Sequence, residues 1–195
     1  MDILLSLLGV VLLLPAMLLI ALVLFVQDGP PILFRHRRIG RGGREFYCLK
    51  FRTMKRNADQ RLRELLENSQ AARLEWQRTR KLKNDPRITR FGRFLRRASL
   101  DELPQFINVL RGEMSLVGPR PIVSAEIPHY GDAYAYYTAV KPGITGLWQI
   151  NGRNDTSYSE RVRFDVQYAR TGTLKTDVII LIKTVAVVLL GHGSY

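Results

Sequence analysis

A chain of 195 residues, 46% of them hydrophobic, is long enough for one domain with a buried core, which excludes a disordered tail and a multi-domain machine. Its 30 Lys and Arg against 17 Asp and Glu predict an anionic partner: nucleic acid, phospholipid or a phosphorylated substrate. The single cysteine and three scattered histidines exclude an internal disulfide framework and offer no zinc-binding spacing. Serine, cysteine and zinc hydrolases are therefore disfavoured.

The chain begins with an uncharged and mostly apolar segment, residues 3–26. A helix of this length would extend about 36 Å, enough to cross the roughly 30 Å hydrocarbon core of a membrane. A signal peptide is disfavoured, because no Lys or Arg precedes the segment and no small-residue cleavage site follows it. We expect residues 1–28 to form a membrane-inserted helix and residues 29–195 to form a single cytoplasmic domain at the membrane face.

Pro15 lies in the middle of this segment, where a lost hydrogen bond and a steric clash predict a kink. Two topologies are then open. A straight span would leave Met1 outside, because the basic residues after the segment hold its other end in the cytoplasm. A sharply broken, re-entrant helix would instead return both ends to the cytoplasm. The physical argument alone favours the span.

The rest of the chain predicts an α+β fold, mostly helical with a small β-hairpin. Residues 32–34 and 45–53 resemble strands, and the glycine-rich residues 39–44 join them. On the second strand Lys50 and Arg52 would share one face, either to present two cations to a phosphate or as an ordinary solvated surface.

Two further segments predict amphipathic helices. Residues 56–83 are rich in charge and indicate a helix with a thin apolar stripe, which we expect to lie against anionic lipid. The charged stretch lacks base-stacking aromatic residues, so nucleic-acid binding is disfavoured. Residues 178–190 are apolar but too few to cross a bilayer, which leaves core packing and docking at the membrane interface both open.

The acidic pair Asp101 and Glu102 is the most informative feature for chemistry. We expect a helix to begin there, with Asp101 or Ser99 as its N-cap, so that the positive end of the helix keeps Asp101 ionised. Three arginines just upstream share one helical face, at i, i+3 and i+4 spacing: Arg93, Arg96 and Arg97. An acid pair among arginines is typical of phosphoryl transfer, although two acids that only cap a helix are the alternative.

Adjacent residues on a helix point in different directions, so Asp101 and Glu102 should have different roles. One would attack phosphorus, and the other would bind a metal ion or transfer a proton. Mg²⁺ prefers oxygen ligands, which makes Asp101 and Glu102 candidate ligands in a site without His or Cys. Downstream, the sequence Gly-Pro-Arg-Pro at 118–121 would fix Arg120 as a phosphate clamp, or would form a structural turn with a surface arginine.

The chain resembles the bacterial sugar transferases, the small monotopic phosphoglycosyl transferases that begin lipid-linked glycan assembly. The blocks that carry the resemblance are residues 2–9, 38–46, 50–54, 85–121 and 141–155. The resemblance implies that Asp101 attacks the β-phosphate of a UDP-sugar, releases UMP and passes the phosphosugar to undecaprenyl phosphate, while Glu102 assists with Mg²⁺ or proton transfer. The amino-acid sequence of residues 57–82 and 143–155 is similar to that of members that transfer galactose or glucose 1-phosphate.

The resemblance also implies positions and a location. Arg96 and Arg120 are expected near the phosphates or the nucleotide, and the other recurrent family residues are Lys50, Arg52 and Asp177. A re-entrant helix and interfacial amphipathic helices would hold the enzyme on the cytoplasmic face of the bacterial inner membrane, in contact with anionic lipids. It would catalyse the first membrane step of exopolysaccharide, O-antigen or capsule synthesis.

Two questions stay open. The competing function is a non-catalytic membrane adaptor that binds anionic lipid through its basic face, and such an adaptor would tolerate the substitution Asp101→Asn. A homodimer is allowed but not required.

Overall fold

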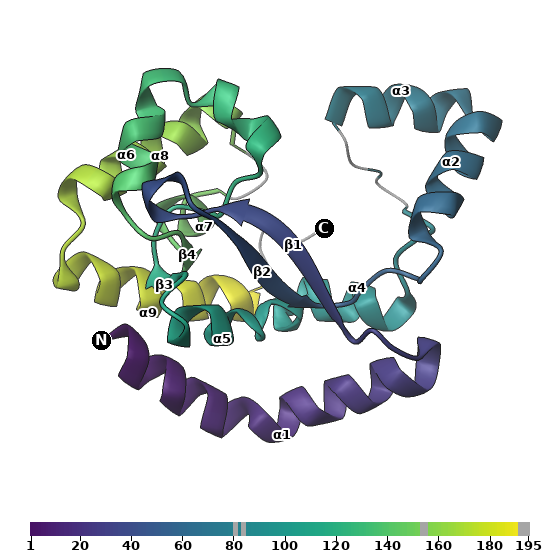
Figure 1. The fold of residues 1–195 in the computed structure, drawn as a ribbon, viewed down its shortest axis with the longest axis horizontal. Coiled ribbons are helices and arrows are strands. Elements are labelled where there is room, and N and C mark those ends of the chain that lie inside the picture. The colour runs from purple at the N-terminus through teal and green to yellow at the C-terminus, as the bar shows by residue number, and fades with distance from the viewer. Residues whose placement is uncertain (80–81, 83–84, 153–155, 191–195) are drawn as a thin grey trace.

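A computed structural model describes residues 1–79, 82, 85–152 and 156–190 (Figure 1). These residues form an α+β fold that is mostly helical with two small sheets, as predicted. The elements in chain order are α1 (Asp2–Asp28), β1 (Leu33–Ile39), η1 (Arg41–Gly43), β2 (Glu45–Phe51), α2 (Ala58–Asn68), α3 (Gln70–Thr79), α4 (Arg90–Arg97), η2 (Leu100–Glu102), α5 (Gln105–Leu110), β3 (Ser115–Val117), η3 (Ser124–His129), η4 (Gly131–Ala133), α6 (Tyr134–Ala139), β4 (Gly143–Thr145), α7 (Leu147–Ile150), α8 (Tyr158–Thr171) and α9 (Leu174–Leu190).

The predicted β-hairpin is confirmed. β1 and β2 pair antiparallel from Leu33 opposite Phe51 to Ile39 opposite Glu45. Gly42 in the connecting turn has φ 68°, a conformation that glycine adopts without steric cost. The first strand is longer than expected from residues 32–34, because its continuation carries exposed arginines that the hydrophobic pattern does not reveal. The second sheet is a parallel pair of β3 and β4.

The apolar segment forms one continuous helix, α1, which contains Pro15 and changes direction near its middle, in the sense of the predicted kink (Figure 1). Both of its ends contact the rest of the chain: Asp2 Oδ1 accepts a hydrogen bond from the Leu116 N–H, and Asp28 accepts one from the Arg56 N–H. Between these ends α1 packs along α5. In the described part of the chain, α1 is the one helix long and apolar enough to cross a membrane.

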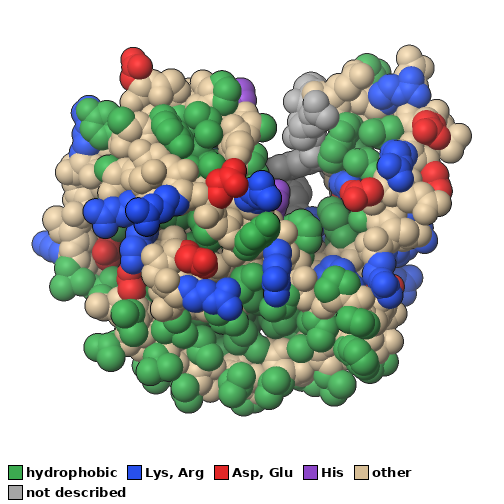
Figure 2. Space-filling view, viewed as in Figure 1, with side chains coloured by type: hydrophobic (Ala, Val, Ile, Leu, Met, Phe, Trp, Pro, Cys, Tyr) green, Lys and Arg blue, Asp and Glu red, His purple; other side chains and the backbone are tan. Residues whose placement is uncertain are grey.

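Most apolar side chains of α1 face away from the protein and line its lower surface in Figure 2. The buried residues of the helix are Ser6, Ile20 and Leu24. Ile20 and Leu24 pack with Phe51 at the end of β2 and with Leu95 of α4. This small core joins the apolar helix to β2 and to α4, the helix that precedes the acidic pair.

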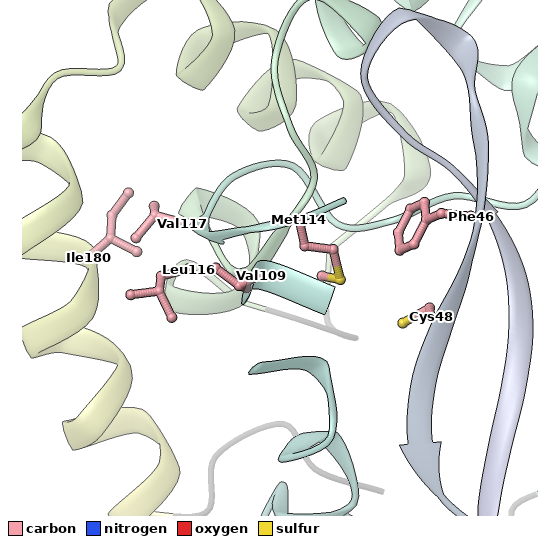
Figure 3. Packing of buried hydrophobic residues seen from close by; sticks show 7 residues of the cluster. All are labelled: Phe46, Cys48, Val109, Met114, Leu116, Val117 and Ile180. Atoms are coloured by element: carbon pink, nitrogen blue, oxygen red, sulfur yellow. The ribbon is translucent and has the colours of Figure 1, made fainter. Parts of the chain in front are cut away.

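A second core lies between the hairpin and the C-terminal helix (Figure 3). Cys48 of β2 and Ile180 of α9 lie at its two ends, and burial raises the pKa of the Cys48 thiol to about 11. Other apolar residues of α9 are exposed: Leu174, Val178, Ile179, Ile182 and Val185. One face of α9 therefore packs into the core, while an apolar face remains at the surface.

The charged stretch between the hairpin and the acidic pair forms two helices rather than one. α2 and α3 meet at Ser69, whose backbone is extended. The pair rises on the side of the molecule away from α1 (Figure 1). The expected contact of this stretch with anionic lipid stays a prediction.

Candidate functional site

The acidic pair lies in a tight turn between α4 and α5, not at the start of a helix. Ser99 adopts the left-handed conformation with φ 55°, and Asp101 and Glu102 follow in the 3₁₀ turn η2. α5 begins only at Gln105, after Pro104. Of the two predicted caps, Ser99 does occupy the N-cap position of η2, but its side chain makes no capping hydrogen bond. Asp101 lies inside η2 and not at a cap, because the turn is closed by i,i−3 hydrogen bonds that begin at Ser99.

A close contact between α4 and the end of the hairpin sets the position of Arg96. A Cβ on Gly92 would lie 2.1 Å from the carbonyl oxygen of Thr53, so only glycine allows this approach. Arg96 then donates from Nε to the Thr53 hydroxyl at 2.9 Å. Arg93 and Arg97 are exposed. Of the three predicted arginines, Arg96 is the one whose charge acts on Asp101 among the described residues.

Burial, not a helix dipole, determines the electrostatics of Asp101. The residue is 8% exposed, and loss of solvation raises the pKa of its carboxyl to about 6, with a further upward contribution from Glu102. The charges of Lys50 and Arg96 act in the opposite direction and lower this pKa. The expected cause, the positive end of a helix, is therefore wrong, although a pKa of about 6 still leaves most of Asp101 ionised above pH 7. The group titrates close to neutral pH, where both of its protonation states are accessible.

Lys50 and Glu102 form the open side of the site. Lys50 Nζ lies 2.5 Å from Glu102 Oε1, and the two side chains are 27% and 35% exposed. Lys50 projects from β2 and therefore reaches the turn from the hairpin side, while Arg96 reaches it from α4. We call Lys50, Arg96, Asp101 and Glu102 the acidic turn site.

Arg120 lies next to this site, in a turn whose backbone is closely packed. The Gly118 N–H donates to the Thr145 carbonyl at 2.8 Å, and a Cβ on Gly118 would lie 2.4 Å from the carbonyl oxygen of Lys141. The Arg120 guanidinium lies 5.4 Å from the centre of the Trp148 ring. Burial, Arg161 and Arg38 lower the pKa of Arg120, and Glu126 and Glu102 oppose this shift. Its electrostatic coupling to Glu102 connects Arg120 to the acidic turn site.

Two more arginines and one glutamate surround Arg120, and sequence reasoning did not identify them as site residues. Arg38 donates to the Pro121 carbonyl at 3.0 Å and lies 3.7 Å from Glu126. Arg161 donates to Glu126 at 3.1 Å. We call Arg38, Arg120, Arg161 and Glu126 the arginine cluster. Its members come from distant segments with no common spacing, so the sequence holds no signal that would have grouped them.

The structure places Arg52 away from the acidic turn site. β2 ends at Phe51, and the Arg52 guanidinium donates to the carbonyls of Gly29 and Pro31 at 2.7 and 2.5 Å. Arg52 thus fastens the end of α1 and does not share a phosphate-facing surface with Lys50. Its substrate contact stays a prediction without support from this position.

Asp177 also lies outside the acidic turn site. At the start of α9 it accepts a hydrogen bond from the Tyr168 hydroxyl at 2.7 Å, and burial raises the pKa of its carboxyl. It lines a cavity together with Asp2 and Lys141, at the N-terminal end of α1. A role of Asp177 in the reaction therefore stays a prediction.

The acidic pair offers a limited set of metal ligands. Among the described residues no three His, Cys, Asp or Glu side chains come together as a metal site. Asp101 and Glu102 provide two neighbouring carboxylates, and Glu102 is already paired with Lys50. Mg²⁺ in phosphoryl-transfer sites is commonly held by one or two carboxylates together with substrate phosphates and water. The pair therefore fits an ion shared with a substrate rather than one enclosed by the protein.

Comparison with known proteins identifies the family to which the chain is similar. The family described as "Bacterial sugar transferase" matches residues 1–191. The chain is 49% identical to the exopolysaccharide production protein ExoY of Sinorhizobium fredii, over 100% of this chain and 86% of that protein. It is 56% identical to the undecaprenyl-phosphate galactose phosphotransferase of Salmonella typhimurium, over 87% of this chain and 36% of that protein.

A third relative has a different sugar in its name. The UDP-glucose:undecaprenyl-phosphate glucose-1-phosphate transferase of Escherichia coli is 40% identical, over 100% of this chain and 40% of that protein. The chain thus spans most of ExoY but less than half of the Salmonella and Escherichia proteins. The match to the family nevertheless extends over nearly the whole chain, and the chain belongs to the bacterial sugar transferase family.

Proposed function

We propose that this chain transfers a hexose 1-phosphate, galactose or glucose, from a UDP-sugar to undecaprenyl phosphate, as the first membrane step of exopolysaccharide, O-antigen or capsule synthesis. The observation that carries the proposal is the acidic turn site, in which a nearly buried Asp101 lies among Lys50, Glu102 and Arg96. The names of the relatives from Salmonella and Escherichia support the donor and acceptor classes.

In the first step, a carboxylate oxygen of Asp101 attacks the β-phosphorus of the UDP-sugar. A bond forms between Asp101 and phosphorus, the bond from phosphorus to the bridging oxygen breaks, and UMP leaves with that bond's electron pair. The nucleophile must be ionised, and a pKa of about 6 leaves most of Asp101 ionised at pH 7.5. Its weak solvation favours attack, because few water contacts must be lost.

The two phosphates of the donor would meet different cations. Arg96 is coupled most strongly to Asp101 after its own desolvation, so it lies beside the phosphate that is attacked. Arg120 is coupled to Glu102 and to the other arginines, so it would bind the α-phosphate, which leaves as UMP. Guanidinium groups suit this role because they form paired hydrogen bonds with phosphate oxygens.

In the second step, a phosphate oxygen of undecaprenyl phosphate attacks the same phosphorus, and the Asp101 carboxylate departs. The product is undecaprenyl diphosphohexose, and the enzyme returns to its starting state. Lys50 holds Glu102 beside the reacting group, where Glu102 would transfer a proton or share Mg²⁺ with Asp101. Asp101 and Glu102 would hold Mg²⁺, and the ion would supply positive charge that neutralises the donor phosphates.

The same proposal places α1 in the cytoplasmic leaflet of the inner membrane as a re-entrant helix. Asp2 and Asp28, at opposite ends of α1, both contact the same domain. A straight span that leaves Met1 on the other side of the membrane would require the Asp2 contact to break. The exposed apolar faces of α1 and α9 would lie in the bilayer, with basic residues near anionic headgroups.

The test is UMP release by detergent-purified protein with Mg²⁺ and undecaprenyl phosphate, with UDP-galactose, UDP-glucose and UDP-N-acetylglucosamine compared side by side. We expect release from UDP-galactose or UDP-glucose, and none from the Asp101→Asn variant. Without the lipid, intact-mass measurement should find the mass of one phosphohexose on the unmodified protein and none on the variant.

Asp165→Asn is the matched control, because Asp165 is also a buried aspartate. If a folded protein releases no UMP from any donor, the transferase proposal fails. If Asp101→Asn retains full activity, Asp101 is not the nucleophile. The adaptor hypothesis predicts that lipid binding is the sole activity and that Asp101→Asn leaves it unchanged.

A further inference from the structure

Two guanidinium groups of the arginine cluster lie against one aromatic ring. Arg120 and Arg161 approach the ring of Trp148 to 5.4 and 5.2 Å from its centre. The ring is fixed by a hydrogen bond of 2.7 Å from Trp148 Nε1 to the Thr156 hydroxyl. Trp148 therefore bridges two cations that would otherwise repel each other.

Arg161 is buried, but its hydrogen bonds satisfy only part of its guanidinium group. It is 4% exposed, and only its Nη1 atom donates to a carboxylate, that of Glu126. Its Nε and Nη2 atoms are buried without a hydrogen-bond partner within the described part of the chain. Unpaired buried donors lower stability, so the position of Arg161 depends on its contacts with the rings of Trp148 and Tyr158.

Arg120 differs from Arg161, because no carboxylate of the described residues lies within ion-pair distance of it, and Glu126 and Glu102 act on its charge only from farther away. No ion pair joins it to any of the residues that the structure describes, and burial, Arg161 and Arg38 all disfavour its charge. Its backbone is held through the N–H that hydrogen-bonds to Asp165. The Trp148 ring is the one contact that orients the guanidinium itself, among the described residues. Removal of the ring would leave Arg120 free to turn away from its positive neighbours.

We propose that Trp148 and Arg161 are positioning residues that hold the Arg120 guanidinium in place for the α-phosphate of the nucleotide donor. The proposal rests on the proposed function, since it assigns these residues to the leaving-nucleotide side of that reaction. An arginine fixed before binding loses less conformational freedom when the phosphate arrives. The positive potential of Arg161 and Arg38 adds to the attraction, and Glu126 limits the repulsion between them.

The proposal predicts weaker nucleotide binding rather than slower chemistry. In Trp148→Leu the Kd for UMP and the KM for the UDP-hexose should each rise about three- to thirtyfold, which is the range of a partly buried cation–π contact. Trp148→Phe keeps an aromatic face, so its Kd for UMP should lie between that of the unmodified protein and that of Trp148→Leu. Arg161→Lys keeps the charge beside Glu126 but loses the planar group, and should weaken UMP binding in the same direction.

The experiment combines calorimetric titration with UMP and steady-state kinetics on the full chain in detergent. The chain has two tryptophans, so Trp76→Phe leaves Trp148 as the one tryptophan, and UMP should change the tryptophan emission. Trp76→Phe also serves as the matched control, because Trp76 stacks on Arg87 outside the arginine cluster and its loss should leave the Kd for UMP unchanged. The KM for undecaprenyl phosphate should change less than twofold in every variant.

An unchanged Kd for UMP in Trp148→Leu, or a fall in kcat with no change in Kd and KM, would overturn the positioning role. If the leucine variant does not fold, the phenylalanine and lysine variants decide the question by the same criteria. Failure of the proposed function would give a different result, because the unmodified protein itself would release no UMP from any donor. If the unmodified protein is active and the variants bind UMP as tightly as it does, only the positioning role is wrong.

Discussion

Two buried aspartates, Asp101 in the acidic turn site and Asp165 beside the arginine cluster, have the same pKa but different surroundings. Burial raises the pKa of each to about 6. Asp165 accepts hydrogen bonds from the Tyr130 hydroxyl at 2.6 Å and from the Arg120 backbone N–H. In the described residues no other side chain donates a hydrogen bond to Asp101. The raised pKa therefore reports burial in both residues, and the two carboxyls differ in whether another side chain donates a hydrogen bond to them. This difference is what the proposed roles, nucleophile for Asp101 and structural carboxylate for Asp165, predict.

The most direct test of the difference between Asp101 and Asp165 is to neutralise each aspartate in turn. Asp101→Asn should lower the rate of UMP release at least about 10³-fold, because an amide cannot replace the attacking oxygen. Asp165→Asn should lower it less than about tenfold, because the amide oxygen can still accept from Tyr130. Initial rates with the same donor and lipid provide the measurement. Equal losses in the two variants would contradict the distinction.

Lys50→Met should have the next largest effect, with a characteristic pH dependence. The Lys50 charge lowers the pKa of Asp101, so its removal should raise that pKa further and leave less of the ionised nucleophile at pH 7. We expect kcat/KM to fall about ten- to a hundredfold at pH 7 and to recover partly at pH 9. The acidic limb of the pH profile should move to higher pH.

Lys175→Met is the control for this substitution, because Lys175 is exposed on α9. Its pH profile should match that of the unmodified protein. An acidic limb that stays in place in Lys50→Met would show that Lys50 acts on the substrate alone.

Arg52→Met separates a structural from a substrate-binding arginine. Loss of the guanidinium leaves the carbonyls of Gly29 and Pro31 without their buried partner, so the free energy of unfolding should fall by about 2 kcal/mol. The kcat/KM of the folded protein should fall less than about tenfold. Thermal denaturation and kinetics together test this. A loss of activity above about a hundredfold with an unchanged melting temperature would instead support the substrate contact that the family resemblance implies.

The smallest effect concerns stability, and its sign differs between the two aspartates. Asp101 has an ordinary pKa of 3.8 when unfolded and about 6 when folded, so the folded state binds more protons and loses stability as pH rises from about 4 to 6. Asp101→Asn removes this loss and should stabilise the protein by about 1 kcal/mol at pH 7.5, with little effect at pH 4. Asp165→Asn should destabilise at pH 7.5, because it adds a buried amide donor near Arg161 and Arg120. Melting temperatures at both pH values provide the measurement. If the two variants change the melting temperature at pH 7.5 in the same direction, the reasoning is wrong.

The sequence predicted those parts of the molecule that depend on local pattern. The hairpin and the long apolar helix follow from hydrophobic and turn patterns, and the arginine face just upstream of the acidic pair indicates that Arg96 is close to Asp101. The approach of Lys50 to the acidic pair did not follow from the pattern, because Lys50 comes from β2, a distant segment of the chain. The start of α5 and the break between α2 and α3 did not follow, because a left-handed Ser99 and an extended Ser69 leave no mark in hydrophobic periodicity.

The arginine cluster was beyond sequence reasoning for a different reason. Arg38 comes from β1, Glu126 from η3 and Arg161 from α8. Each is an ordinary charged residue in its own segment, and only the folded chain reveals that one glutamate pairs with two arginines. Trp148 is likewise informative only through the guanidinium groups beside it.

The attachment of α1 beneath the acidic turn determines how far a lipid substrate would have to travel. Leu100 and Leu103, which flank the acidic pair, pack against the core that contains Ile20 and Leu24 of α1. With α1 in the bilayer as proposed, the leucines on either side of the acidic pair would hold Asp101 close to the hydrocarbon. Moving a lipid tail into water costs about 0.8 kcal/mol for each CH₂ group. Undecaprenyl phosphate could meet Asp101 with its tail still dissolved in the membrane, so no energy is needed to extract it.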